Sequence, residues 1–145
     1  MPDQETLKRA RKDAREGKSP STQAGEFVRE EMDHIREGKH GARSPQQAIA
    51  IGLSKARRAG VKLAPPKGSS SLRKKAAQDE KASQRPHQTS GKRSRATENA
   101  LQREPRSSAS KKALSKHAKQ VAVKRGKQVR HRSAEKAAST LKRAS

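Results

Sequence analysis

The chain of 145 residues contains no cysteine, no tryptophan and no tyrosine, and Phe27 is its only phenylalanine. Without cysteine it can form neither a disulfide nor a thiolate-bound metal site, and this agrees with a reducing compartment. Without tryptophan and tyrosine it has almost no rings on which unpaired bases could stack. The composition therefore argues against recognition of single strands by base stacking.

Long apolar runs are missing as well. Hydrophobic residues make up 28% of the chain, the mean hydropathy is −1.26, and no run approaches the roughly 18 apolar residues that cross a bilayer. The first nine residues lack the apolar stretch and the cleavage site of a secretory signal. We therefore expect a cytoplasmic protein without stable membrane insertion.

Acidic residues are scarce, with 14 Asp and Glu against 37 Lys and Arg, for a net charge of +23. Most of the imbalance lies late in the chain: residues 1–64 hold 14 basic and 9 acidic side chains, and residues 65–145 hold 23 and 5. A segment this basic repels itself, and it gains free energy by releasing the counterions condensed on a polyanion. The charge predicts nucleic acid as the partner.

The basic segment 65–145 has few large apolar side chains from which to build a core. They are Leu72, Leu101, Leu114, Val121, Val123, Val129 and Leu141. So few cannot offset a backbone entropy cost of about 1–2 kcal/mol per residue. We predict a long intrinsically disordered Lys/Arg/Ala/Ser-rich tail over 65–145, in which 111–127 and 134–144 can become helical on a polyanion.

Residues 22–37 show the apolar periodicity of an amphipathic helix. One stripe is formed by Ala24, Phe27, Val28, Met32 and Ile35. Acidic residues predominate on the other side, and Gly38 can supply the left-handed residue that ends a helix.

Residues 45–59 carry clear start and stop signals for a second helix. Ser44 can cap it, Pro45 suits its first position, and Gly60 can end it. This helix is basic whereas the preceding one is acidic, and a short loop joins them. We predict an antiparallel helical hairpin whose core is formed by Phe27, Ile35, Ile49 and Leu53.

The sequence thus predicts a small all-α fold with a long disordered basic tail. Residues 1–20 form a charged N-terminal helix and linker, in which a thin apolar line predicts a third, frayed helix over about 4–16. Residues 21–64 form the helical hairpin domain, and residues 65–145 form the tail. Since so small a hairpin is marginally stable, we expect it to form a homodimer or to dock on a protein partner.

Basic clusters recur along the tail at intervals that suit successive phosphates. The predicted nucleic-acid-binding residues are Arg73, Lys74, Lys75, Lys92, Arg93, Arg95, Lys111, Lys112, Lys116, Lys119, Lys124, Arg125, Lys127, Arg130 and Arg132. No aromatic residue lies among them, so sequence-tolerant binding of duplex DNA, or of structured RNA, fits best. A merely solvating tail and binding to an anionic membrane surface are the alternatives.

A second set of cations lies in and beside the predicted hairpin: Lys39, Arg43, Lys55, Arg57 and Arg58. The loop 38–43 holds two glycines and two cations just before a helix N-terminus, where free N–H groups favour an anion. It can contact a phosphate, or it can be an ordinary flexible turn.

Catalytic and metal-binding patterns are not recognisable in the sequence. The histidines are His34, His40, His87, His117 and His131, and they show no metal-ligand spacing. No combination of nucleophile, base and orienting group can be assembled. We expect no enzyme activity, no metal and no cofactor.

Residues 36–60, which read REGKHGARSPQQAIAIGLSKARRAG, and the upstream block STQAGEFV at 21–28 resemble an uncharacterised family of short basic bacterial proteins. The resemblance covers roughly residues 1–66 and implies a bacterial source, but it brings no catalytic or ligand-binding residues. The tail is similar in composition to histone-H1-like bacterial proteins, whose Lys- and Ala-rich segments condense DNA.

Together these features predict a non-enzymatic, sequence-tolerant nucleic-acid-binding protein, either nucleoid-associated or an accessory DNA-binding protein. The tail would bind phosphates, with duplex DNA favoured over RNA, and the hairpin would mediate self-association or docking. The alternative is a protein-interaction, stress-protection or ribosome-associated protein whose basic tail serves as a solvating appendage.

Overall fold

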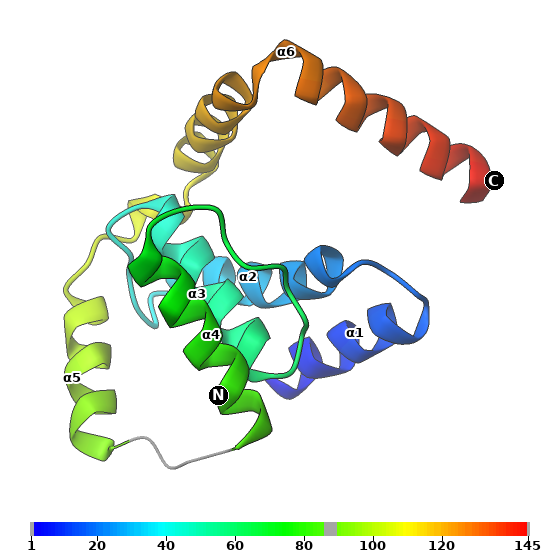
Figure 1. Ribbon diagram of the computed structural model, residues 1–145. Coiled ribbons are helices and arrows are strands. Elements are labelled where there is room, and N and C mark those ends of the chain that lie inside the picture. Colours follow the sequence, from blue (N-terminus) through cyan, green and yellow to red (C-terminus); the bar gives the residue numbers. More distant parts are fainter. Residues whose placement is uncertain (1, 86–89, 145) are drawn as a thin grey trace. The chain divides into compact units, whose positions relative to one another are not determined.

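The computed structural model describes residues 2–85 and 90–144, and within these ranges it contains helices and no strand (Figure 1). The elements are α1 (Gln4–Arg15), α2 (Pro20–Arg36), α3 (Pro45–Arg58), α4 (Ser70–Gln84), α5 (Gly91–Gln102), the 3₁₀ turn η1 (Ser107–Ala109) and α6 (Lys111–Ala144). The all-α class predicted from the sequence is confirmed. The chain divides into two compact units, residues 1–110 and residues 111–145.

The two predicted helices of the hairpin, α2 and α3, begin with the same device. The side chain of Ser19 accepts a hydrogen bond from the backbone N–H of Thr22, and that of Ser44 accepts one from Gln47. A proline follows each cap at the first helical position, where its missing N–H costs nothing. Within the first unit, α2 and α3 make the most extensive helix–helix contact.

Small residues form the buried face of α3. They are Ala48, Gly52 and Ala56, one on each successive turn. A Cβ added at Gly52 would lie only 2.7 Å from the Cα of Val28 on α2, so the two backbones meet almost directly. The helices can approach this closely only where α3 has no large side chain.

The predicted core is therefore half correct. Phe27 and Ile35 on α2 are fully buried, but Ile49 and Leu53 on α3 are only partly buried. Leu53 packs against the edge of the core instead of filling it. Large apolar side chains were expected at the centre of the pair, and the close backbone approach leaves no room for them there.

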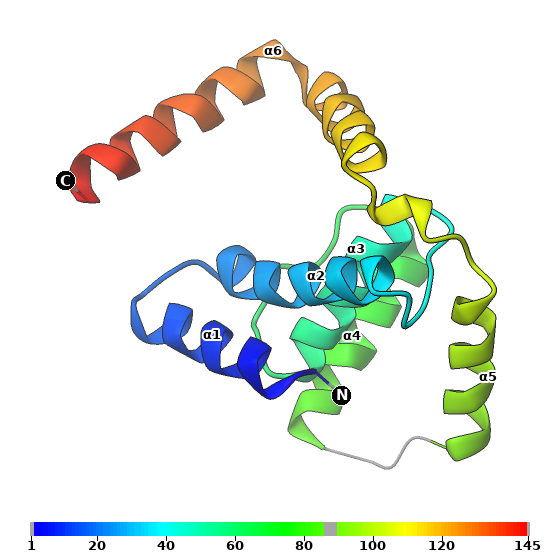
Figure 2. The same ribbon diagram turned by 180° about the vertical axis from the view of Figure 1, so that it is seen from behind.

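The N-terminal helix α1 packs along α2 (Figure 2). Its Ala10 is buried in the main core cluster with Phe27, and Leu7 packs against that cluster. The Arg9 guanidinium also donates to the Glu26 carboxylate over 2.6 Å. The fraying predicted for this helix does not fit these contacts, because Ala10, Leu7 and the ion pair of Arg9 all hold it against α2 and the core.

Helix α4 packs against α3 and belongs to the first unit. It buries Ala76 and Asp79, and the Asp79 carboxylate accepts hydrogen bonds from Arg58 (2.8 Å) and Lys75 (2.6 Å). Residues 70–84 were predicted to be part of a disordered tail, and the structure corrects this. The prediction counted large apolar side chains, whereas this contact uses a small one and a buried ion pair.

The end of α5 and the segment after it cover the loop between α2 and α3. The N–H of Gly41 donates to the carbonyl of Leu101 (2.9 Å), and the N–H of Ala42 donates to that of Pro105 (3.0 Å). The Arg106 guanidinium donates to the carbonyls of Ile35 and Arg36 at the C-terminal end of α2. A cation at this end also complements the helix dipole.

Helices α5 and α6 differ from the others because neither contains a buried residue. Helix α6 makes up nearly the whole second unit, and Gly126, at φ 75° and ψ 164°, divides it into two helical parts. Of the two segments predicted to be capable of helix formation, 134–144 lies within the second part, whereas 111–127 extends across the non-helical Gly126. Of the helices in the described part of the chain, none is long and apolar enough to cross a membrane.

Candidate nucleic-acid interface

Helix α6 carries the largest net positive charge of the described helices, with 12 Lys and Arg against a single acidic residue, Glu135. Nine of the predicted phosphate-binding residues lie on it, and all nine are exposed: Lys111, Lys112, Lys116, Lys119, Lys124, Arg125, Lys127, Arg130 and Arg132. Glu135 is paired with His131 at 3.2 Å. The helix therefore presents a surface on which cations outnumber acids twelve to one.

In the first part of α6 the lysines align on one side. Lys112, Lys116 and Lys119 are separated by four and three residues, which places them on successive turns of one face. They line one shallow surface hollow together. A row of ammonium groups about one helical turn apart can contact successive backbone phosphates of one strand.

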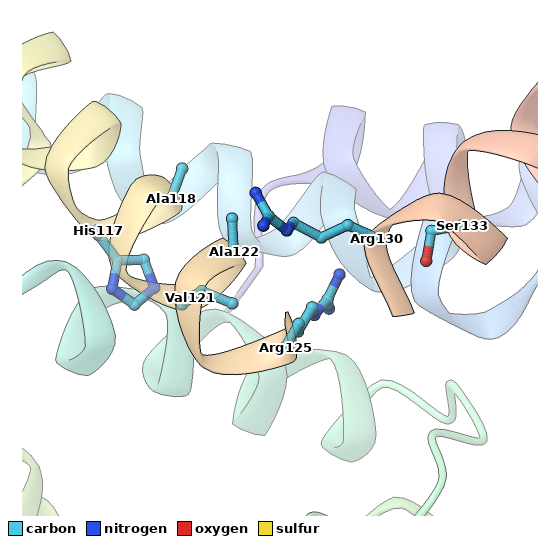
Figure 3. A pocket seen from close by; sticks show the side chains of 7 residues that line it. All are labelled: His117, Ala118, Val121, Ala122, Arg125, Arg130 and Ser133. Carbon is cyan, nitrogen blue, oxygen red and sulfur yellow. The ribbon is translucent and has the colours of Figure 1, made fainter. Parts of the chain in front are cut away.

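A second hollow, of about 360 Å³, lies at the bend of α6 (Figure 3). Arg125 precedes the bend and Arg130 follows it, and both side chains reach into the hollow. The wall on the N-terminal side includes the apolar side chains of Val121 and Ala122. Because Gly126 has a backbone conformation that L side chains rarely adopt, the bend that brings the two guanidinium groups together requires glycine.

The remaining predicted tail cations lie on α4 and α5 and are exposed: Arg73, Lys74, Lys75, Lys92, Arg93 and Arg95. Two of them have partners within the chain. Lys75 is paired with Asp79, and Arg95 donates to the carbonyl of Gly91 over 3.3 Å. These residues are accessible to a polyanion, but Lys75 would have to leave a buried carboxylate to reach one.

Two cations of the second predicted set serve internal carboxylates instead. Lys55 pairs with the fully buried Glu31, and Arg58 pairs with Asp79. Burial raises the pKa of Asp79, but hydrogen bonds from Lys75, Ser54 and Arg58 lower it more, so that this pKa lies below its ordinary value. Lys55 and Arg58 are thus positioned to neutralise buried charge.

The other members of that set lie at the surface. Lys39 pairs with Glu37 at 3.2 Å, Arg43 lies 4.0 Å from Glu104, and Arg57 donates to the carbonyl of Ala64. The loop 38–43 itself is not an open turn. A Cβ at Gly41 would lie 1.9 Å from the carbonyl oxygen of Glu104, so the returning segment covers the loop backbone. Within this loop, the two cationic side chains of Lys39 and Arg43 remain available to a phosphate, whereas the backbone does not.

The structure also brings together two histidines that show no metal-ligand spacing in the sequence. His34 and His40 both lie beside the buried carboxylate of Glu31, and their ring centroids are 6.2 Å apart. Only the folded loop after α2 places His40 there, so helical periodicity gave no indication of the contact. His117 and His131 lie on α6, and His87 lies outside the described residues.

Residues 17–68 match the model of a family described as "Family of unknown function (DUF6496)". The matched segment begins in the turn before α2 and ends just before α4, so it contains α2 and α3. The matched residues overlap most of the region, roughly 1–66, in which the sequence resembles an uncharacterised family. No curated protein and no solved structure matches the chain.

Proposed function

We propose that the protein is a non-enzymatic, sequence-tolerant nucleic-acid-binding protein, nucleoid-associated or accessory to DNA, whose principal phosphate-binding element is α6. The observation that supports this most strongly is the combination of 12 cations, one acid and no buried residue in that helix. A helix with this composition has little reason to form for the sake of packing within its own chain. Neutralisation of its positive charge by a polyanion would stabilise the helix instead.

The predicted disorder of the tail forms part of this proposal for α6. Helices in proteins owe most of their stability to tertiary packing, and α6 leaves Val123 and Leu141 more than 70% exposed. We therefore expect α6 to exchange between helix and coil in the free protein. Phosphates would relieve the repulsion between its lysines and shift the population toward helix.

The first unit would act as the platform for this element. Its helices α2 and α3 carry the segment that matches the family model, and their packing provides a folded body for self-association or for docking on a partner. The similarity of the tail in composition to histone-H1-like bacterial proteins is consistent with condensation of DNA by the assembled protein.

The test is binding of a fluorescent duplex, followed by anisotropy across a salt series. If α6 and its neighbours neutralise about eight phosphates, log K should fall with log salt at a slope of about −7. Replacing Lys112, Lys116 and Lys119 by Gln should reduce that slope by about 2.7, or 0.9 for each lost phosphate contact.

The control removes the same amount of charge from the first unit, at Lys8, Arg11 and Lys12 on the exposed side of α1. This variant should keep nearly the slope of the unaltered protein. Equal losses in the two triple variants would show that net charge alone governs binding and would refute the assignment to α6. Repeating the series with duplex RNA and with single strands separates the classes of nucleic acid.

A further inference from the structure

A buried cluster of ionisable groups lies where the start of α1, the second half of α2 and the loop after α2 meet. Glu30 and Glu31 on α2 are 4% and 0% exposed. The backbone N–H of Asp3 donates to Glu30 Oε1 over 2.7 Å. His34 and His40 complete the cluster and are also largely shielded. Buried carboxylates are costly unless cations or hydrogen-bond donors compensate them.

The hydrogen bonds of His40 determine which of its nitrogens carries hydrogen. Its Nδ1 lies 2.9 Å from the backbone carbonyl oxygen of Gly41, which can only accept, so Nδ1 must be the donor. In a neutral imidazole Nε2 then has a bare lone pair. That atom lies 2.9 Å from Glu31 Oε2, which is also an acceptor. Two acceptors at this distance need a cation between them, either a proton or a metal ion.

His34 has a similar arrangement on the other side of Glu31. Its Nε2 lies 3.2 Å from Asp3 Oδ2, and its Nδ1 lies 4.0 Å from Glu31 Oε1. When Nε2–H donates to Asp3, the lone pair of Nδ1 is directed to the side where Glu31 lies. An outer acceptor that fixes the tautomer of a histidine is the usual second sphere of a metal ligand.

The cluster is short of positive charge and of donors. Against the three carboxylates of Asp3, Glu30 and Glu31 stand two lysines: Lys55, which pairs with Glu31 Oε1, and Lys39, which acts on Asp3 electrostatically. Glu30 Oε2 is buried and has no hydrogen-bond partner among the described residues. A divalent cation would compensate the remaining negative charge and fill the position between His40 Nε2 and Glu31 Oε2.

We propose that Glu31, His34 and His40 form a binding site for a divalent transition-metal ion of the Zn²⁺ type, with Asp3 and the Gly41 carbonyl as its second sphere. One ligand atom from each of the three residues lies within 4.8 Å of the others. Zn–N and Zn–O bonds of about 2.0–2.1 Å place ligands of a tetrahedral site about 3.4 Å apart, so small side-chain shifts suffice.

The chemistry of the donors selects the class of metal. Two imidazole nitrogens suit Zn²⁺, Ni²⁺ or Co²⁺, whereas Mg²⁺ and Ca²⁺ prefer oxygen ligands throughout. Three protein ligands leave a fourth position for water. Since the chain has no cysteine, any tight binding of a transition metal has to use histidine and carboxylate.

The experiment is a calorimetric titration of the full chain, freed of metal by a chelator, with Zn²⁺. A parallel titration with Co²⁺ is followed by visible absorption, which reports tetrahedral coordination. We expect one equivalent to bind. His34→Gln and His40→Gln should each weaken binding by about 100-fold or more, and Asp3→Asn by about 10-fold, as is typical of a second-sphere partner.

His131→Gln is the matched control, because His131 is exposed and faces Glu135 in an ordinary pair on α6. It should bind Zn²⁺ as the unaltered protein does. Circular dichroism before titration confirms that each variant is folded. If either histidine variant of the cluster fails to fold, Asp3→Asn decides, since the Asp3 side chain is exposed. Unchanged affinity in the folded cluster variants, or loss of binding with His131→Gln, would overturn the proposal.

Discussion

Replacement of Gly52 by alanine tests the close contact between α2 and α3 directly. In a helix interior, alanine is favoured over glycine by about 1 kcal/mol, so helix propensity alone predicts stabilisation. At Gly52, however, the new Cβ would lie 2.7 Å from Val28 Cα and 2.9 Å from both Val28 N and Val28 Cγ2. Real Cβ atoms essentially never come this close to a neighbour.

The magnitude follows from which atoms must yield. A flexible side-chain end could rotate away, but here two of the three neighbouring atoms are backbone, so the helices must separate. Overpacking typically costs about 1–3 kcal/mol, and a backbone clash belongs at the upper end of that range. After subtraction of the gain in propensity, we expect Gly52→Ala to destabilise the first unit by about 2 kcal/mol.

Gly25 on α2 provides the matched control. It lies inside a helix, is exposed, and has no atom within 4 Å of its added Cβ. Gly25→Ala should therefore stabilise the protein by about 0.5–1 kcal/mol. The same substitution is thus expected to change the stability of the protein in opposite directions at two glycines of the α2–α3 pair.

The assay is thermal unfolding followed by far-ultraviolet circular dichroism, because the chain lacks tryptophan and tyrosine as fluorescent reporters. For a unit of about this size, 1 kcal/mol shifts Tm by roughly 4–8 °C, so Gly52→Ala should lower Tm by about 10 °C. A Tm for Gly52→Ala equal to or above that of Gly25→Ala would refute the argument that the backbones meet at this point.

Three further outcomes are expected. Gly41→Ala should detach the segment that covers the loop, because the new Cβ would lie 1.9 Å from the Glu104 carbonyl oxygen; the measurement is faster amide hydrogen exchange at residues 41 and 42, whose N–H groups donate to that segment. The pKa of Asp79 is lowered in the folded protein, so its contribution to stability is present above its unfolded pKa of about 3.9 and is lost as pH falls below that value; a Tm–pH series should lose this dependence in Asp79→Asn. Gly126→Ala should straighten α6, since alanine is strained at φ 75°; a distance between spin labels on engineered cysteines on either side of residue 126 should lengthen, and an unchanged distance would contradict the assignment of the bend.

Local signals in the sequence were sufficient for the boundaries of α3, whereas α2 begins at Pro20, two residues before the predicted start. Ser44, Pro45 and Gly60 mark the start and the stop of α3, and the structure has the cap, the proline and the positive φ at these positions. The apolar stripe of α2 likewise identified Phe27 and Ile35. These features depend on residues within a few positions of one another, so a single sequence contains them.

Features formed by residues far apart in the chain were not predictable in this way. The buried face of α3 looks weak by composition because its members are small. The return of residues 101–106 is held mainly by backbone hydrogen bonds and by Arg106, which leave no apolar pattern. The approach of His40 to Glu31 depends on how the loop after α2 folds, and neither residue spacing nor periodicity encodes that.

The cover over the α2–α3 loop has a practical consequence for dissecting the protein. The N–H groups of Gly41 and Ala42 donate to carbonyl oxygens at Leu101 and Pro105, beyond the end of the segment that matches the family model. A fragment limited to residues 17–68 would leave these donors without their protein acceptors and would uncover Ala42, which is fully buried in the whole chain. Such a fragment should be less soluble than residues 1–110 and should unfold less cooperatively. A capture experiment with the fragment would therefore also retain proteins that bind a surface which is buried in the whole chain.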